Sequence, residues 1–139
     1  MKKLVCIILL GVVLLGCCGC SLLYEDKVNE IPLSKNVIVE FTDEDGRVWM
    51  TNKHIRSVSL MCSESENTID FALTEEGSQT MAAATEANIG RVLEVRVNGE
   101  VIIAPTVNVK IEDTSFWLYM GEDYEKCVSL YETLTGEKL

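Results

Sequence analysis

Six cysteines and one histidine are the residues of this 139-residue chain with the widest range of chemistry. A thiol can act as a nucleophile, bind zinc, form a disulfide or be acylated, and histidine is the commonest general base. Four cysteines lie close to the N-terminus, between Cys6 and Cys20, whereas Cys62 and Cys127 are the only two in the remainder. This uneven distribution indicates separate roles for the two groups.

The N-terminal segment 1–16 has the layout of a secretory signal. Lys2 and Lys3 form a short positive region, and an unbroken apolar run follows over 4–16. That run is short for a membrane span, which needs about 20 residues. We therefore interpret residues 1–16 as a signal peptide.

The residues at the end of this run predict a lipid anchor. Leu14-Leu15-Gly16-Cys17 resembles the lipobox of bacterial lipoproteins, in which a cysteine after a small residue receives a diacylglycerol thioether and becomes the new N-terminus. The resemblance implies lipidation of Cys17, a tether over residues 17–35, and a location at the cell membrane with the domain outside the cytoplasm. More than one acyl chain suffices for stable anchoring.

An uncleaved anchor is the alternative interpretation. The segment 4–24 carries no formal charge and is long enough to cross a bilayer as a helix. Both interpretations place Lys2 and Lys3 in the cytoplasm and the rest of the chain outside.

The two body cysteines leave two possibilities open. Outside the cytoplasm Cys62 and Cys127 could form a disulfide, and a buried pair of thiols fits the sequence equally well. Two cysteines do not make the spacing patterns of zinc sites, so we expect no metal.

The exported part lacks the residue sets of common catalytic sites. His54 is the sole histidine, and its turn-like TNKH segment predicts an exposed side chain. Nucleophile-elbow, Walker, dinucleotide and zinc-protease motifs are absent. The acidic turn 43–46 departs from a calcium loop because Gly46 comes too early. The sequence predicts a non-enzymatic protein without a cofactor.

The charge of the chain argues against nucleic acid as a partner. The formal net charge is −10. It becomes −12 once Lys2 and Lys3 are removed with the signal peptide, because the segment 1–16 contains no acidic side chain. A body this acidic repels phosphate backbones. The same charge repels anionic lipid headgroups, so the body would stay away from such a surface unless it is tethered.

Hydrophobic patterning predicts the elements of residues 36–139. The pattern predicts strands over residues 36–42, 47–51, 55–62, 68–73, 91–97, 101–104, 106–111 and 115–120. A helix capped by Thr74 runs to about Asn88, and a second helix covers residues 122–135. Strands 55–62 and 68–73 should form a hairpin, and Asn98-Gly99 is the strongest hairpin turn signal.

The faces of the helices follow from the same patterning. The expected inner face of the first helix contains Met81, Ala84 and Ala87 or Asn88, and that of the second contains Tyr124, Cys127, Val128, Tyr131 and Leu134. The order of strands and helices, joined by hairpins, predicts an α+β domain. It should contain a mainly antiparallel sheet with two helices packed on one face.

The central block of residues 69–105 carries a resemblance to a known family. Its matching residues are Glu76-Gly77, Thr85, Asn88, Gly90, Arg91, Gly99, Val101, Ile102, Ala104 and Pro105. They resemble the head subdomain of the first periplasmic domain of SecD and SecDF protein translocase subunits, over about residues 48–139. The resemblance implies an α+β head over residues 36–139, and we expect structural roles for the matched residues.

Specific backbone roles are expected within that block. Gly90 and Gly99 supply freedom at a helix end and a tight turn, Asn88 should cap the helix exit in left-handed geometry, and Pro105 should kink an outer strand. The membrane helices and base subdomain of the translocase subunit are not in this sequence. The resemblance therefore implies binding rather than proton-driven transport.

Two aromatic residues are the candidate binding residues. Trp117 and Tyr119 share one face of the predicted last strand with Ser115. If exposed, they would form a surface for an extended peptide, and the alternative is that both faces are covered. We expect a lipid-anchored protein that binds a protein or unfolded polypeptide, linked to protein export. The alternative is a structural or interaction lipoprotein of the envelope with no role in translocation.

Overall fold

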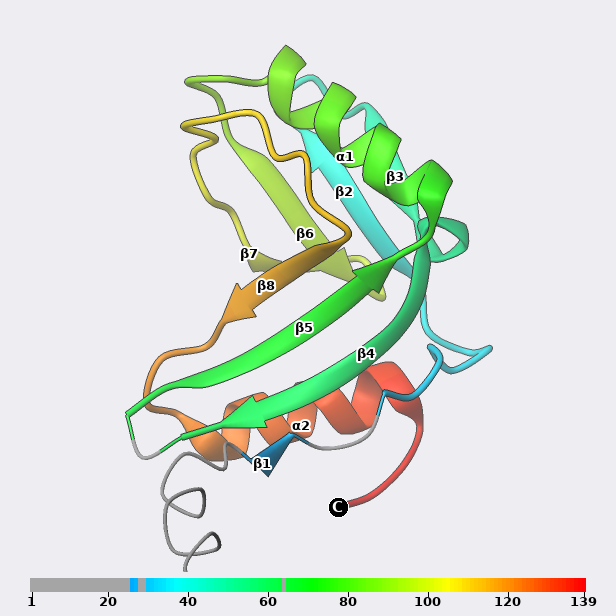
Figure 1. Ribbon diagram of the computed structural model, residues 1–139, viewed down its shortest axis with the longest axis vertical. Helices are drawn as coiled ribbons and strands as arrows, with labels where there is room; N and C mark the ends of the chain where they lie inside the picture. The colour runs from blue at the N-terminus through cyan, green and yellow to red at the C-terminus, as the bar shows by residue number, and fades with distance from the viewer. Residues whose placement is uncertain (1–25, 28–29, 64) are drawn as a thin grey trace, which may run out of the picture.

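The computed structural model describes residues 26–27, 30–63 and 65–139 (Figure 1). The signal peptide predicted over residues 1–16 and the lipidation site Cys17 lie outside the described residues, as does the first part of the tether. No helix in the described part is both long enough and apolar enough to span a bilayer.

The described strands form two antiparallel sheets of four strands each, and Figure 1 shows how they are arranged. The first sheet, in spatial order, contains β1 (Asp26–Lys27), β4 (Ile55–Cys62), β5 (Asn67–Leu73) and β8 (Ser115–Tyr119). The second contains β3 (Val48–Thr51), β2 (Val39–Asp43), β6 (Leu93–Val97) and β7 (Glu100–Ile103). The predicted β4–β5 hairpin is confirmed.

Two helices complete the α+β fold. Helix α1 (Glu75–Ala87) contacts β3, β5 and the 3-10 turn η2 (Asn52–His54), whereas α2 (Tyr124–Thr135) packs against β4 and β5. The two sheets meet in one core, where the rings of Phe41 in β2 and Phe116 in β8 pack edge to face with centroids 5.4 Å apart. Each element buries an apolar face against this core, which holds the layers together.

The predicted α+β class with antiparallel strands and two helices is confirmed, but the strands do not form the single sheet we expected. The β2–β3 hairpin pairs with β6 instead of continuing into β4. The turn η2 separates β3 from β4 and redirects the chain, so that α1 and α2 lie over different parts of the core.

Capping and turn chemistry explain where the elements begin and end. The Thr74 hydroxyl accepts the Gly77 backbone N–H at 3.0 Å, and the Asp123 carboxylate accepts the Lys126 N–H at 2.9 Å. Asn98 and Gly99 adopt positive φ angles of 52° and 83°, as a tight hairpin turn between β6 and β7 requires. The Thr74 cap and the turn are as predicted, whereas the Asp123 cap was not predicted and starts α2 at Tyr124, two residues later than expected.

Two details of the helix faces and exits differ from expectation. Asn88 is not left-handed, with φ −116°, and its side-chain amide instead donates to the Ala84 carbonyl at 2.8 Å. Gly90, at φ 82°, takes the left-handed position, because glycine has no Cβ to clash there. Of the two residues expected to complete the inner face of α1, Asn88 is buried and Ala87 is exposed. Tyr124 is exposed rather than inward, and the buried face of α2 includes Leu130 instead.

His54 is buried, which corrects the expectation of an exposed side chain. Its Nδ1 accepts the Thr51 backbone N–H at 3.0 Å, closing the η2 turn. The start of α1 lies directly against this turn, with the Thr74 N–H donating to the His54 carbonyl at 3.0 Å. The imidazole is thus part of the fold.

The chain between Ile103 and β8 is not the continuous strand expected over residues 106–111. Pro105 cannot donate to a ladder, and β7 ends before it. The following residues form only single bridges, from Thr106 to Val92 and from Val107 to Ile89. We call residues 104–114 the crossing segment, because they cross from the second sheet to the first.

The described part of the predicted tether contacts the domain. Ile31 exchanges two backbone hydrogen bonds with Val58, at 2.9 and 2.8 Å. The Ser34 N–H donates to the Leu134 carbonyl at 2.8 Å. With β1 paired to β4, these contacts attach the N-terminal side of the chain to one edge of the first sheet and to the end of α2.

Candidate functional site

Strand β8 carries the two predicted binding residues at the edge of the first sheet. Alternation along the strand turns Leu118 into the core, where it is 1% exposed, while Trp117 and Tyr119 are 63% and 54% exposed. The exposure that a binding role requires is therefore present. We call Trp117 and Tyr119 the aromatic stripe.

The outer face of the first sheet forms a shallow hollow beside the stripe. Tyr119 lies in register with Thr68 of β5, which in turn lies opposite Met61 of β4. These residues, together with Cys62, Ser63, Glu66 and Trp117, line a hollow of about 340 Å³, which we call the stripe hollow. Aromatic and thioether groups here offer apolar contact with a ligand.

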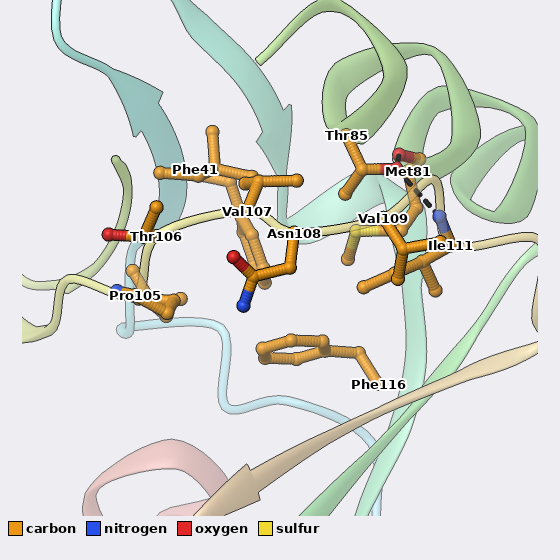
Figure 2. A pocket seen from close by; sticks show the side chains of 12 residues that line it. Phe41, Met81, Thr85, Pro105, Thr106, Val107, Asn108, Val109, Ile111 and Phe116 are labelled. Atoms are coloured by element: carbon orange, nitrogen blue, oxygen red, sulfur yellow. Dashed lines mark hydrogen bonds between the residues drawn. The ribbon is translucent and has the colours of Figure 1, made fainter. Parts of the chain in front are cut away.

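A more apolar cleft lies on the other side of β8 (Figure 2). This apolar cleft has a volume of about 210 Å³ and lies between β2, β6, α1, β8 and the crossing segment. Its apolar lining includes Phe41, Leu93, Val95, Val107, Ile111 and Phe116. Figure 2 shows the Phe116 ring below the crossing segment and the Thr85 and Met81 side chains above it.

Hydrogen bonds from the matched residues hold the crossing segment over the apolar cleft. The Thr85 hydroxyl accepts the Ile111 N–H at 2.9 Å and donates to the Met81 carbonyl at 2.8 Å (Figure 2). The Gly90 N–H donates to the Val107 carbonyl at 2.7 Å. These bonds join the end of α1 to the crossing segment, which supports a structural role for Thr85 and Gly90.

The other matched residues lie around this segment or farther away. The Pro105 carbonyl accepts the Leu93 N–H at 3.1 Å, and the exposed Ala104 precedes it at the end of β7. Asn88 is buried at the end of α1, and Gly99 lies in the β6–β7 turn. None of these residues touches the aromatic stripe through a described hydrogen bond.

A third hollow connects the apolar cleft with the stripe. This edge hollow has a volume of about 280 Å³ and is lined by Ile111, Asp113, Ser115, Phe116 and Trp117. It shares Ile111 and Phe116 with the apolar cleft, and Trp117 with the stripe hollow. The three hollows therefore follow one another along β8.

The charges along these hollows are acidic. Glu66 lines the stripe hollow and Asp113 the edge hollow, and no lysine or arginine is among the lining residues of any of the three. Lys110 in the crossing segment is engaged by Glu112 at 2.6 Å, and this pairing raises the pKa of Lys110. The surface is suited to noncovalent contact with an apolar or cationic ligand.

The two body cysteines belong to the contact between α2 and β4. Cys127 is buried in α2 as a free thiol, and burial, together with the nearby Cys62, raises the pKa of its thiol to about 11. The thiol is therefore protonated and weakly nucleophilic at neutral pH. A disulfide between Cys62 and Cys127 under oxidising conditions stays a prediction.

The acidic turn uses its carboxylates within the protein. Asp43 accepts the backbone N–H groups of Asp45 and Arg47 at 3.0 and 2.9 Å, and the Trp49 indole N–H at 2.8 Å. The indole bond is the main reason that the pKa of Asp43 is lowered. Arg91 pairs with Asp45 at 2.8 Å. Among the described residues no group of three or more potential ligands could hold a metal ion.

The apolar cleft was not found from the sequence. Its lining comes from five segments spread between Phe41 and Phe116, one of which is the crossing segment, and no local pattern in any one segment points to the others. The sequence contained one partial signal, Pro105, which ends β7 and releases the crossing segment from the sheet.

Comparisons with known proteins identify relatives of this fold. The family model described as the SecDF P1 head subdomain matches residues 23–138. The protein translocase subunit SecD of Acidaminococcus fermentans is 28% identical over 80 residues, which cover 57% of this chain and 19% of that protein. This chain therefore spans only a small part of that relative's length.

Two solved structures share the fold. One is described as a membrane component SecDF that enhances protein export, with a TM-score of 0.57, 17% identity and coverage of 70% of this chain and 46% of that one. The other is described as SecDF in a super-membrane-facing form, with a TM-score of 0.58, 19% identity and coverage of 68% and 13%. At these identities the likeness concerns the fold.

Proposed function

Because the chain belongs to the SecDF P1 head subdomain family, we propose that it is a membrane-anchored, extracytoplasmic protein whose head binds unfolded polypeptide segments without catalysing a reaction. The observation that carries the proposal is the exposed aromatic stripe of Trp117 and Tyr119 beside the apolar cleft. The aromatic stripe and the apolar cleft lie on opposite sides of a single strand, β8.

Such a surface suits polypeptides better than small rigid ligands. Aromatic and aliphatic side chains give contact that depends little on the ligand's sequence, which a general polypeptide receptor needs. The three hollows lie along β8, and the acidic residues that line two of them favour segments that are not themselves acidic.

The proposed anchor keeps this surface near the lipid. If Cys17 is acylated, eight residues separate it from Asp26, the start of β1. Eight residues span at most about 30 Å, so the first sheet stays close to the membrane. A polypeptide that emerges from a membrane channel would meet the head within that range, and this supports a link to protein export.

A binding assay tests the core of this proposal. The full chain, purified in detergent, is titrated against ribonuclease A that has been reduced and carboxamidomethylated, which keeps this basic polypeptide unfolded. We expect saturable binding, with folded ribonuclease A as a control of the same composition. Equal binding of the folded and unfolded forms, or none of either, would contradict the proposal.

A matched pair of tyrosine variants locates the site. Tyr119 on β8 and Tyr124 at the start of α2 are both 54% exposed. Tyr119→Ala should weaken binding of the unfolded polypeptide several-fold, because one stacking surface is lost, whereas Tyr124→Ala should leave binding unchanged. Identical affinities of the two variants would place the site elsewhere.

Crosslinking in cells tests the link to export. A photoreactive phenylalanine at position 119 should crosslink to newly made exported polypeptides, and the crosslinks should vanish when secretion is blocked. The same group at position 124 is the control. Crosslinks only to resident envelope proteins would instead favour the alternative of an interaction lipoprotein without a role in translocation.

A further inference from the structure

We infer that the bound polypeptide adds to the first sheet as a new strand, along the free edge of β8. This inference rests on the proposed function and specifies how the polypeptide is held. Strand β8 is the last strand of its sheet and pairs only with β5 among the described strands. The opposite edge of the sheet is the two-residue strand β1, on the side of the predicted anchor.

The hydrogen bonds that flank β8 identify the backbone groups that face outward. Met120 donates to the Asn67 carbonyl at 2.8 Å, and Thr114 accepts the Leu73 N–H at 2.8 Å. In an antiparallel ladder every second residue faces the partner strand, so the backbones of residues 116 and 118 also face β5. The N–H and C=O groups of Ser115, Trp117 and Tyr119 therefore point to the free edge.

The space at this edge is open to a ligand. The edge hollow is lined by Ser115, Phe116 and Trp117 on β8, and by Ile111 and Asp113 of the crossing segment. It joins the apolar cleft on one side and the stripe hollow on the other. An added strand would lie along a row of hollows.

The alternating side chains of an added strand would have different surroundings. On one face of the sheet they would lie near Phe116 and the apolar cleft, and on the other near the aromatic stripe. Strand addition of this kind obtains affinity from the backbone and selectivity from alternate side chains. This explains how one site could accept many sequences.

The composition of β8 lacks the usual protection of an exposed edge. Sheet edges are commonly blocked by lysine, proline or inward-pointing charges, and the sequence SFWLY contains none of them. The edge strand β7 of the second sheet is different, because Pro105 closely follows it and Glu100 begins it. The edge strand β3 of the second sheet, VWMT, also lacks such residues, but α1 packs against it. The edge of β8 lies beside the hollows instead.

Charge defines the occupant as a partner rather than a second copy of this chain. Glu66 and Asp113 line the hollows beside β8, and no cationic side chain does. A second copy, without residues 1–16, would bring a net charge of −12 to this acidic edge. The complementary ligand is an extended polypeptide with alternating apolar residues and a net positive charge.

N-methylated peptides test the inference. The probe is a fluorescent nine-residue peptide that alternates valine and threonine and has lysine at both ends. Two isomers each carry four N-methyl groups, on either the odd or the even residues of positions 2–9, which removes one row of N–H donors at a time. We expect one isomer to bind the full chain about tenfold more weakly and the other to bind like the parent peptide.

The outcomes separate this inference from the proposed function. If the parent peptide binds and the two N-methylated isomers bind with equal affinity, strand addition is overturned and the proposal of polypeptide binding stands. If neither the parent peptide nor unfolded ribonuclease A binds, both the added strand and the proposed polypeptide binding are overturned. Self-association of the full chain that the parent peptide cannot displace would show that a second copy occupies the edge, and would also overturn the inference.

Amide hydrogen exchange provides a second readout on the same complex. The amides of Trp117 and Tyr119 should exchange at least about tenfold more slowly when the parent peptide is bound, because they become hydrogen-bonded. The amide of Leu118 already faces β5 and serves as the internal control. Slowing at Leu118 alone, or at none of the three, would contradict the added strand.

Discussion

The backbone carbonyl of His54 lies where any side chain at Gly77 would begin. A Cβ at Gly77 would be 2.9 Å from the carbonyl carbon of His54 and closer still to its oxygen. Glycine at this position lets the first turn of α1 lie directly against the η2 turn. The glycine is therefore required by packing, since its φ angle is not unusual.

The change Gly77→Ala should destabilise the head by about 3 kcal/mol, at the upper end of the range for overpacked sites, because neither backbone can easily move away. The free energy of unfolding in urea, followed by tryptophan fluorescence of the full chain in detergent, measures the effect. Gln79→Ala, an exposed position on the same helix, is the control and should change stability little. Equal stability of the two variants would refute the close contact.

Thr85→Val should loosen the crossing segment. The buried Thr85 hydroxyl is the acceptor for the Ile111 N–H, and its loss leaves that donor without its partner, at a cost of about 1–3 kcal/mol. Amide exchange at Ile111 should accelerate. Thr80→Val removes a similar hydroxyl, which donates to the Glu76 carbonyl within the helix, and should leave Ile111 unchanged. If amide exchange at Ile111 accelerates in both variants, the effect does not come from the hydrogen bond between Thr85 and Ile111.

The stability of the head should fall as the pH rises from about 9 to about 11. Burial raises the pKa of the Cys127 thiol from 9.0 to about 11, so the folded state holds this proton more tightly than the unfolded chain. Below pH 9 the thiol is protonated in both states and contributes no pH dependence. Between the two pKa values the unfolded chain ionises first, and up to about 2–3 kcal/mol is lost.

The difference between the wild-type chain and Cys127→Ala isolates this effect, because every other ionisable group, including Tyr131, is present in both. Unfolding free energies are measured at several pH values in the presence of a phosphine reductant, which keeps Cys62 and Cys127 reduced. The wild-type chain should lose stability relative to the variant as the pH rises. Parallel curves would show that the thiol pKa is not raised in the folded state.

Mass spectrometry of the chain purified from membranes should find an N-terminus at Cys17 with the added mass of a diacylglycerol and a further acyl group. Cys17→Ala should retain the segment 1–16 and carry no acyl mass, because no thiol is present for the transfer. Cys18→Ala is the control and should be processed normally. An acylated and cleaved Cys17→Ala chain would exclude this cysteine as the anchor.

Much of the local structure was predictable because it depends on residues a few positions apart. The alternation of residues 115–119 was enough to predict that Trp117 and Tyr119 share a face opposite Leu118, and the structure confirms it. Thr74 was predicted as a cap from its place before two acidic residues. The Asn98-Gly99 turn was evident from residue type alone.

The division into two sheets, the burial of His54 and the apolar cleft were decided by the tertiary structure. The ring contact between Phe41 and Phe116 joins segments that are far apart in the chain, and neither strand contains a signal for the other. Alternation and capping act within one element, whereas the choice of strand partners depends on the total apolar area that the whole chain can bury. The sequence therefore determined which faces are apolar, and only the packing of those faces decided where a cleft and a free edge remain.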